Sequence, residues 1–193
     1  AQLGAWGVEN KLVNKNRETS THPKCNLVNA RSMEHFRRMG ISKQLRSVGL
    51  PSDHPQDVVY FTRLNKPEFA RVQIASSHRS LEESYKPNPT WPTPEPPYRV
   101  SQIYTEQVLL EHACSFSASK INFGEELIAF KDEGDRVIAT FRDVVSGEKI
   151  KIAAKWLVGC DGGTGVVRPS LDIPYVGEGG AADGVADGTC LLN

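Results

Sequence analysis

The chain has 193 residues, of which 39% are hydrophobic and 24% are charged, and its 23 basic and 23 acidic side chains give a formal net charge of zero. No basic excess is available to neutralise a phosphate backbone or an anionic lipid surface, so neither nucleic acid nor a membrane is expected as a partner. No apolar run approaches the roughly 20 residues of a bilayer span, and the N-terminal AQLGAWGVENK lacks the order of a signal peptide. A soluble, cytoplasmic protein is therefore expected.

The N-terminal quarter of the chain predicts part of a nucleotide-binding fold. Residues 3–13 have the pattern of a helix tail capped at Gly7 and followed by a strand, which is the second half of a βαβ unit. After a polar loop, two helices are predicted, from residue 30 to 40 and from residue 42 to 48. Their buried faces are expected to carry Met33, Phe36, Leu45 and Val48.

After these helices, the sequence predicts β-strands and a Pro-rich connection. Residues 57–64 and 69–74 predict two β-strands joined by a turn-prone Asn-Lys-Pro sequence. Residues 85–98 contain six prolines and therefore predict an extended, polyproline-like connection. The simplest interpretation of this connection is a linker, and a Pro-rich interaction module around Trp91 is the alternative.

The C-terminal half predicts one helix followed by strands. The helix is expected over residues 105–116, with Thr105 as its N-cap. Three strands of an antiparallel meander follow, separated by turns at Gly134-Asp135 and Ser146-Gly147; they are expected at residues 126–132, 136–143 and 149–154. In residues 155–162 an apolar run ends in Asp-Gly, as is expected of a buried parallel strand that finishes at a ligand crevice.

The cysteines predict no disulfide framework and no metal site. Cys25, Cys114, Cys160 and Cys190 are far apart and form no C-x-x-C pair, so free thiols are expected. For Cys114 and Cys160, buried packing is favoured over a nucleophilic role because neither has a candidate base beside it.

Three positions are candidates for binding a ligand. Asp161, at a predicted strand end, could accept hydrogen bonds from ribose or ribitol hydroxyls, and Gly162 would let the backbone approach a bulky ligand, although Asp-Gly is also a common turn. Arg31, at a predicted helix N-terminus, could clamp an anion or remain a solvated surface side chain. The Gln102 amide could bond a cofactor or cap the chain.

These residues lie in motifs that resemble a known family. The stretches STHPKCNLVNARSMEHFRRMGI, PPYRVSQIYTEQVLLEHA and WLVGCDGGTGVVR, in this order, resemble the FAD-dependent aromatic-ring hydroxylases (group A flavoprotein monooxygenases), and phenol and chlorophenol hydroxylases look closest. The resemblance extends from about Leu3 to Glu178. It implies an oxidoreductase with FAD as cofactor and NADPH or NADH as electron donor. Such an enzyme reacts the reduced flavin with O2 and hydroxylates a small aromatic substrate from a flavin hydroperoxide; the full-length family includes homodimers.

The resemblance also implies roles for single residues. The Arg that matches Arg31 contacts the FAD pyrophosphate region, and the Gln that matches Gln102 contacts the cofactor. The Asp that matches Asp161 binds a sugar or ribitol hydroxyl, and its motif is linked to NADPH recognition. The acidic residue that holds the adenosine ribose corresponds to Asn14, which can still hydrogen-bond a hydroxyl but forgoes the charge-assisted bond. No catalytic acid or base is identified, because each of the five histidines is better explained as a surface or packing residue.

The sequence departs from the family pattern at both ends. It begins after the family's G-x-G-x-x-G loop, it has Gly165 where a Ser is usual, and it contains no later G-D-A-x-H segment. We therefore keep an alternative to the enzyme: a truncated or degenerate relative, non-catalytic, that binds FAD weakly or not at all.

The expected fold class is α/β: a fragment of an FAD/NAD(P)-binding, Rossmann-like domain with an antiparallel β-meander and part of an inserted β-rich substrate domain. The expected organisation has four parts. They are an FAD-binding part (1–52), a partial substrate domain with the Pro-rich connection (53–100), a second FAD-binding part with the meander (101–178) and an irregular tail (179–193).

Overall fold

The computed structural model describes residues 1–84 and 93–174. The chain divides into two compact units, Ala1–Gly124 and Glu125–Asn193. Within the described residues, no helix is long and apolar enough to cross a membrane. Most of the Pro-rich connection, including Trp91, and the end of the tail, including Cys190, lie outside the described residues.

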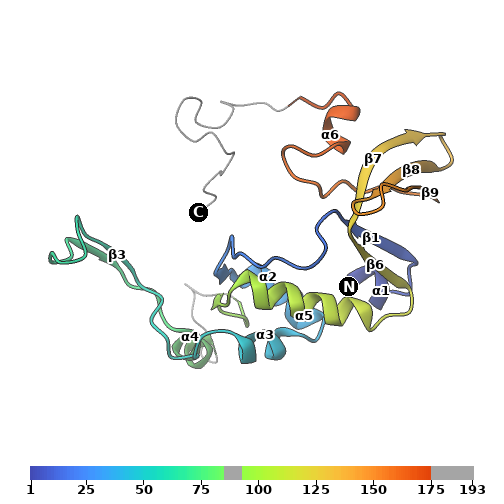
Figure 1. The fold of residues 1–193 in the computed structure, drawn as a ribbon. Helices are drawn as coiled ribbons and strands as arrows, with labels where there is room; N and C mark the ends of the chain where they lie inside the picture. The colour runs from blue at the N-terminus through green and yellow to red at the C-terminus, as the bar shows by residue number, and fades with distance from the viewer. Residues whose placement is uncertain (85–92, 175–193) are drawn as a thin grey trace. The chain divides into compact units, whose positions relative to one another are not determined.

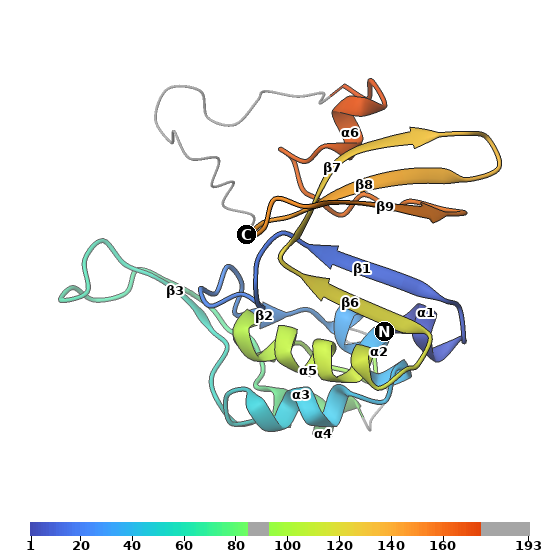
Figure 2. The same ribbon diagram turned by 45° about the vertical axis from the view of Figure 1, so that its right-hand side comes forward.

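The first unit opens with a short helix packed beside a parallel pair of strands. Helix α1 (Gln2–Ala5) leads into strand β1 (Asn10–Asn14), which pairs in parallel with β6 (Ser119–Phe123), as Figure 2 shows. A Cβ on Gly4 would lie 2.3 Å from Ser119 Oγ, so only glycine allows this approach. The predicted helix and strand are confirmed, whereas the sequence pattern did not reveal β6.

Three helices surround the apolar core of this unit (Figure 1). Helices α2 (Ala30–Arg38) and α3 (Ser42–Val48) pack with α5 (Gln102–Cys114). The buried side chains form two clusters: Met33, Tyr98 and Val100 in one, and Ile41, Leu45 and Val108 in the other. The prediction that Val48 faces inward is wrong, because this last residue of α3 borders an open groove and stays 37% exposed.

Two short strands, β2 and β5, precede helices α2 and α5. Strand β2 (Leu27–Val28) precedes α2 and pairs antiparallel with β5 (Tyr98–Arg99), which precedes α5. Helix α5 begins earlier than predicted because Ser101 is its N-cap, with Oγ accepting the N–H of Ile103 at 3.4 Å. The prediction of Thr105 as N-cap is wrong: its hydroxyl donates back to the Ser101 carbonyl at 3.2 Å, inside the helix.

Between α3 and β5 lie a hairpin and a helix. The predicted hairpin is confirmed in shorter form, as β3 (Val58–Tyr60) paired antiparallel with β4 (Ala70–Val72). Helix α4 (Ser77–Ser84) follows and was not predicted.

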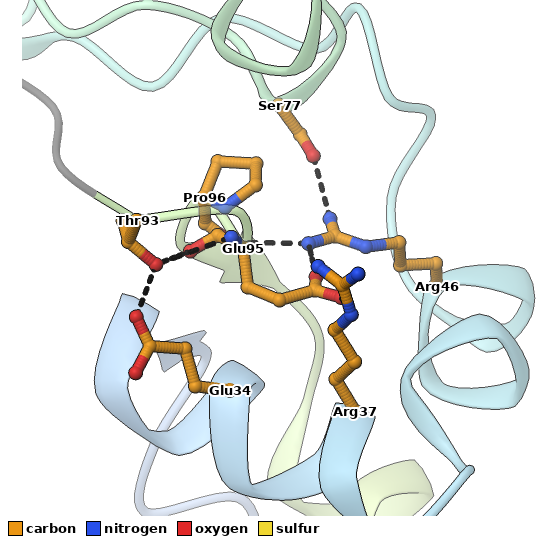
Figure 3. A network of polar contacts seen from close by, with 7 residues as sticks. All are labelled: Glu34, Arg37, Arg46, Ser77, Thr93, Glu95 and Pro96. Carbon is orange, nitrogen blue, oxygen red and sulfur yellow. Dashed lines mark hydrogen bonds and ion pairs between the residues drawn. The ribbon is translucent and has the colours of Figure 1, made fainter. Parts of the chain in front are cut away.

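A polar network ties α3 to α4 and to the segment before β5 (Figure 3). Arg46 Nη1 donates to Ser77 Oγ at 2.7 Å, and Arg46 Nη2 lies 2.7 Å from the carboxylate of Glu95. The Tyr98 hydroxyl donates to the Arg46 carbonyl at 2.6 Å and also contacts the Leu50 carbonyl, and the Arg46 guanidinium lies 5.0 Å from the Tyr98 ring centroid. The Glu95 side chain is only 9% exposed, so this ion pair is largely shielded from water.

The second unit contains the predicted meander. Strands β7 (Glu125–Asp132), β8 (Val137–Asp143) and β9 (Lys149–Ala154) form a three-stranded antiparallel sheet in that order. The turn glycines Gly134 and Gly147 have positive φ, as their positions in tight hairpins require. A short helix, α6 (Val167–Ser170), follows.

The prediction of a buried parallel strand over residues 155–162 is wrong. Within the described residues no strand pairs with this segment, and Trp156 and Val158 are 78% and 77% exposed. A continuous apolar run forms a parallel strand only when neighbouring strands and covering helices bury it. Cys114 and Cys160 are likewise exposed rather than buried, and Cys25, Cys114 and Cys160 are free thiols.

Candidate nucleotide-binding site

Asn14 lies where an α/β fold presents ligand-binding side chains. It is the last residue of β1, opposite Phe123 in parallel β6, so it stands at the carboxyl end of a parallel pair. Its Oδ1 accepts the N–H of Asn16 at 2.9 Å. This bond fixes the orientation of the exposed amide and leaves its NH2 group to donate to a ligand hydroxyl.

Arg31 occupies the first turn of α2. The helix is capped by Asn29, whose Oδ1 accepts the Ser32 N–H at 2.9 Å. Arg31 is exposed, and its guanidinium has no hydrogen bond or ion pair with another described residue. A fork of donors at the positive end of a helix dipole can take an anion such as a pyrophosphate.

Gln102 is engaged in holding a loop. Its Oε1 accepts the Lys24 N–H at 3.1 Å, and its Nε2 donates to Glu106 Oε1. Glu106 in turn accepts the Ser20 N–H at 2.7 Å through Oε2. The side chains of Gln102 and Glu106 therefore anchor the loop over residues 20–25 to the first turns of α5.

Strands β2 and β5 separate Arg31 from Gln102. Because the two strands are antiparallel, with Leu27 opposite Arg99, the start of α2 and the start of α5 lie at opposite ends of the ladder. The structure therefore does not gather these two residues into one cluster.

An open groove of about 670 Å³ lies beside β5 and the start of α5. We call it the Arg99 groove; it is lined by the end of α3, the following loop, β5 and the start of α5, and its residues include Asn26, Leu50, His54, Asp57, Arg99 and Tyr104. The sequence pattern did not reveal it, because three separate parts of the sequence build it: Asn26, residues 48–57 and residues 99–104.

Asp161 and Gly162, in the second unit, form a compact turn. Asp161 Oδ2 accepts the N–H groups of Val166 at 2.6 Å and Val167 at 3.0 Å. These two hydrogen bonds hold the pKa of the Asp161 carboxyl below its usual value, and the bond from Val167 has the larger effect. Gly162 has φ +77°, a conformation that favours glycine. Asp161 is exposed, so a ligand can reach its carboxylate.

The same turn explains why position 165 is a glycine. A Cβ at this position would lie 2.0 Å from the Asp161 carboxyl carbon, so the departure from Ser accommodates the carboxylate. Arg168 donates to the Ile173 carbonyl at 2.8 Å and the Gly163 carbonyl at 3.3 Å, which closes the loop. Within the described part of the chain, no group of three or more His, Cys, Asp or Glu side chains could hold a metal ion.

A polar residue at the carboxyl end of a parallel strand is a feature of nucleotide-binding α/β proteins, and so is an arginine at a helix N-terminus that, like Arg31, pairs with no other described residue. The comparisons with known proteins specify the class. A family model described as FAD binding domain matches residues 1–187. The chain therefore belongs to the FAD binding domain family, which confirms the expected fold class.

Known relatives agree with this family. The chain is 27% identical over 185 residues to a 2,4-dichlorophenol 6-monooxygenase of Cupriavidus pinatubonensis, covering 96% of this chain and 30% of the relative. It is 31% identical over 191 residues to the FAD-dependent monooxygenase apdD of Emericella nidulans, covering 95% and 29%. It is similar to the solved structure of the rebeccamycin biosynthetic enzyme RebC with reduced flavin, with 31% identity, a TM-score of 0.67 and coverage of 82% and 29%.

The resemblance to FAD-dependent aromatic hydroxylases is thereby confirmed. The chain spans about 30% of the length of the curated relatives that it matches.

Proposed function

We propose that this chain is the FAD-holding part of a monooxygenase that hydroxylates a small, phenol-type aromatic substrate. The observation that carries the proposal is the match to the FAD binding domain over residues 1–187, together with a chlorophenol monooxygenase that aligns with 96% of the chain. The flavin, when bound, supplies the oxygen chemistry: electrons come from NADPH or NADH, and hydroxyl is delivered to the ring from a flavin hydroperoxide.

Several of the described residues offer contacts for this cofactor. Exposed Asn14 has amide donors for a ribose hydroxyl at the end of β1, and exposed Arg31 has a guanidinium for the pyrophosphate. Gln102 keeps the adjoining loop in place through Lys24, and its second amide N–H would donate to the cofactor. Asp161 accepts a ribitol or sugar hydroxyl, and Gly162 allows the backbone to approach it.

A second candidate is a relative that keeps the fold but binds FAD weakly and does not catalyse. Two observations favour it: the Gln102 side chain already bonds Lys24 and Glu106, and Asp161 Oδ2 already accepts two backbone N–H groups.

Flavin retention by the purified chain tests the proposal. We expect a yellow protein with nearly one FAD per chain. We also expect Arg31→Ala and Asp161→Ala each to weaken FAD binding about tenfold, because each loses a charge-assisted contact. Arg63→Ala is the matched control, since Arg63 is an exposed arginine of the β3–β4 connection whose side chain bonds no other described residue. A colourless chain that gains no flavin on titration would support the second candidate.

A further inference from the structure

We propose that the Arg99 groove binds the aromatic substrate as its phenolate, with the Arg99 guanidinium donating to the anionic oxygen. The inference rests on the proposed function, because that function supplies the substrate class. It assigns to Arg99, Leu50 and Tyr104 a role in substrate binding. The argument depends on the groove's fixed walls, its unused hydrogen-bond donors and its apolar lining.

The walls of the groove are fixed by short contacts. A Cβ on Gly49 would lie 2.3 Å from the Tyr98 ring and 2.7 Å from the Arg99 carbonyl, so the loop after α3 packs directly on β5. The Leu50 N–H donates to that same Arg99 carbonyl at 3.0 Å. The Tyr98 hydroxyl contacts the Leu50 carbonyl. A site held in this way is formed before its ligand arrives, which lowers the cost of binding.

Arg99 is the side chain lining the groove that combines a permanent positive charge with unused hydrogen-bond donors. The charged and titratable side chains that line the groove are His54, Asp57, Arg99 and Tyr104. Both oxygens of Asp57 are occupied: Oδ1 accepts the Ile74 N–H at 3.0 Å, and Oδ2 accepts Arg71 Nη1 at 2.9 Å. Arg99, in contrast, makes one long hydrogen bond, from Nη2 to the Gln56 carbonyl at 3.4 Å. Its remaining N–H groups have no bond to a described residue, so they can take an anionic oxygen.

The lining favours an aromatic anion over a phosphate. Backbone N–H groups bind phosphates, but those of Leu50, His54 and Val100 already donate to carbonyls of the chain, and Pro55 has none. Large apolar side chains border the groove and keep exposed surface, with Leu50 42% and Tyr104 50% exposed. A volume of about 670 Å³ lies within the usual range for small-molecule sites. A flat ring with one charged oxygen matches these properties.

The test is a calorimetric titration of the full 193-residue chain without flavin, at a pH above the pKa of the phenol. The probes are 2,4-dichlorophenol and 2,4-dichloroanisole, which differ in that the anisole oxygen cannot ionise. We expect the phenolate to bind about tenfold more tightly than the anisole, and Arg99→Gln to remove this preference while leaving anisole binding unchanged. Arg99→Lys, which keeps the charge, should retain part of the preference. Arg63→Gln should change neither affinity.

Three outcomes would overturn the inference. The first is equal binding of phenol and anisole by the unaltered chain. The second is a preference for the phenolate over the anisole that survives in Arg99→Gln. The third is displacement of the phenol by one equivalent of FAD, which would assign the groove to the flavin. The comparison of phenol with anisole contains no flavin, so its result does not depend on whether the chain retains FAD. A chain that binds the phenolate through Arg99 but retains no FAD would contradict the proposed function and leave this inference standing.

Discussion

At the scale of single residues, the turn around Asp161 predicts how one glycine controls a carboxylate. Gly165→Ala places a methyl group 2.0 Å from the Asp161 carboxyl carbon, so we expect the carboxylate to leave the N–H groups of Val166 and Val167. Since those N–H groups lower the pKa of Asp161, its pKa should rise toward the ordinary value in the variant. An NMR titration of the Asp161 carboxyl carbon measures this change.

The sign of the accompanying pH effect follows from the lowered pKa. A carboxyl whose native pKa lies below its unfolded value stabilises the fold fully above about pH 4, and this contribution is lost as the pH falls through the native pKa. Gly165→Ala should therefore reduce the acid dependence of stability. Thr164→Ala, a neighbouring exposed position, is the control. An unchanged Asp161 pKa in Gly165→Ala would show that the turn has another place for the methyl group.

The residue scale also shows what the sequence could predict of the site. Asn14 is the last residue of β1, and the resemblance to the family already assigned this position to a strand end. Arg99 could not be singled out, because its role depends on Leu50, Asn26 and Asp57, which come from separate parts of the chain. The engagement of Gln102 with Lys24 is also a contact across 78 positions in the sequence, which no local pattern records.

At the scale of elements, the local sequence pattern predicts those strands that pair with a strand adjacent in the sequence. The β7–β9 meander and the β3–β4 hairpin were predicted because turn residues separate adjacent strands. Strand β6 was missed because its partner β1 lies more than a hundred positions earlier. The prediction of a strand at residues 155–162 is wrong for a related reason. An apolar run forms a buried strand only where other elements, distant in the sequence, cover it.

The network around Arg46 predicts that one carboxylate holds several elements together. In Glu95→Gln, Arg46 keeps its charge in a site where its side chain is 19% exposed but loses the carboxylate at 2.7 Å. We expect the free energy of unfolding to fall by about 3 kcal/mol, as in other shielded ion pairs that lose one partner. Urea unfolding followed by circular dichroism measures the change.

An exposed ion pair of the same geometry provides the control for that prediction. Glu126 and Arg142 are separated by 2.6 Å on neighbouring strands β7 and β8, but their side chains are 32% and 49% exposed. Glu126→Gln should cost less than about 1 kcal/mol, because water solvates the arginine that remains. Equal losses in the two variants would contradict the view that shielding from water gives the Glu95 pair its importance.

At the scale of the whole molecule, the division into two compact units predicts that stability is local. Both buried apolar clusters, which contain Met33 and Leu45, lie in the unit Ala1–Gly124. The strands β7, β8 and β9 satisfy their ladder hydrogen bonds with one another. Leu45→Ala removes a fully buried side chain and should cost about 3 kcal/mol. We expect faster hydrogen exchange in α2, α3 and α5, and unchanged exchange in β7, β8 and β9.

Hydrogen exchange followed by mass spectrometry, peptide by peptide, tests this expectation. The reciprocal variant is Phe141→Ala, which removes a buried ring from the central strand β8 and should accelerate exchange in the meander alone. A uniform acceleration over the whole chain in either variant would mean that the two units unfold together. Selective effects in both variants would mean that each unit orders its proposed ligand-binding residues by its own packing. These residues are Asn14, Arg31 and Arg99 in the first unit, and Asp161 in the second.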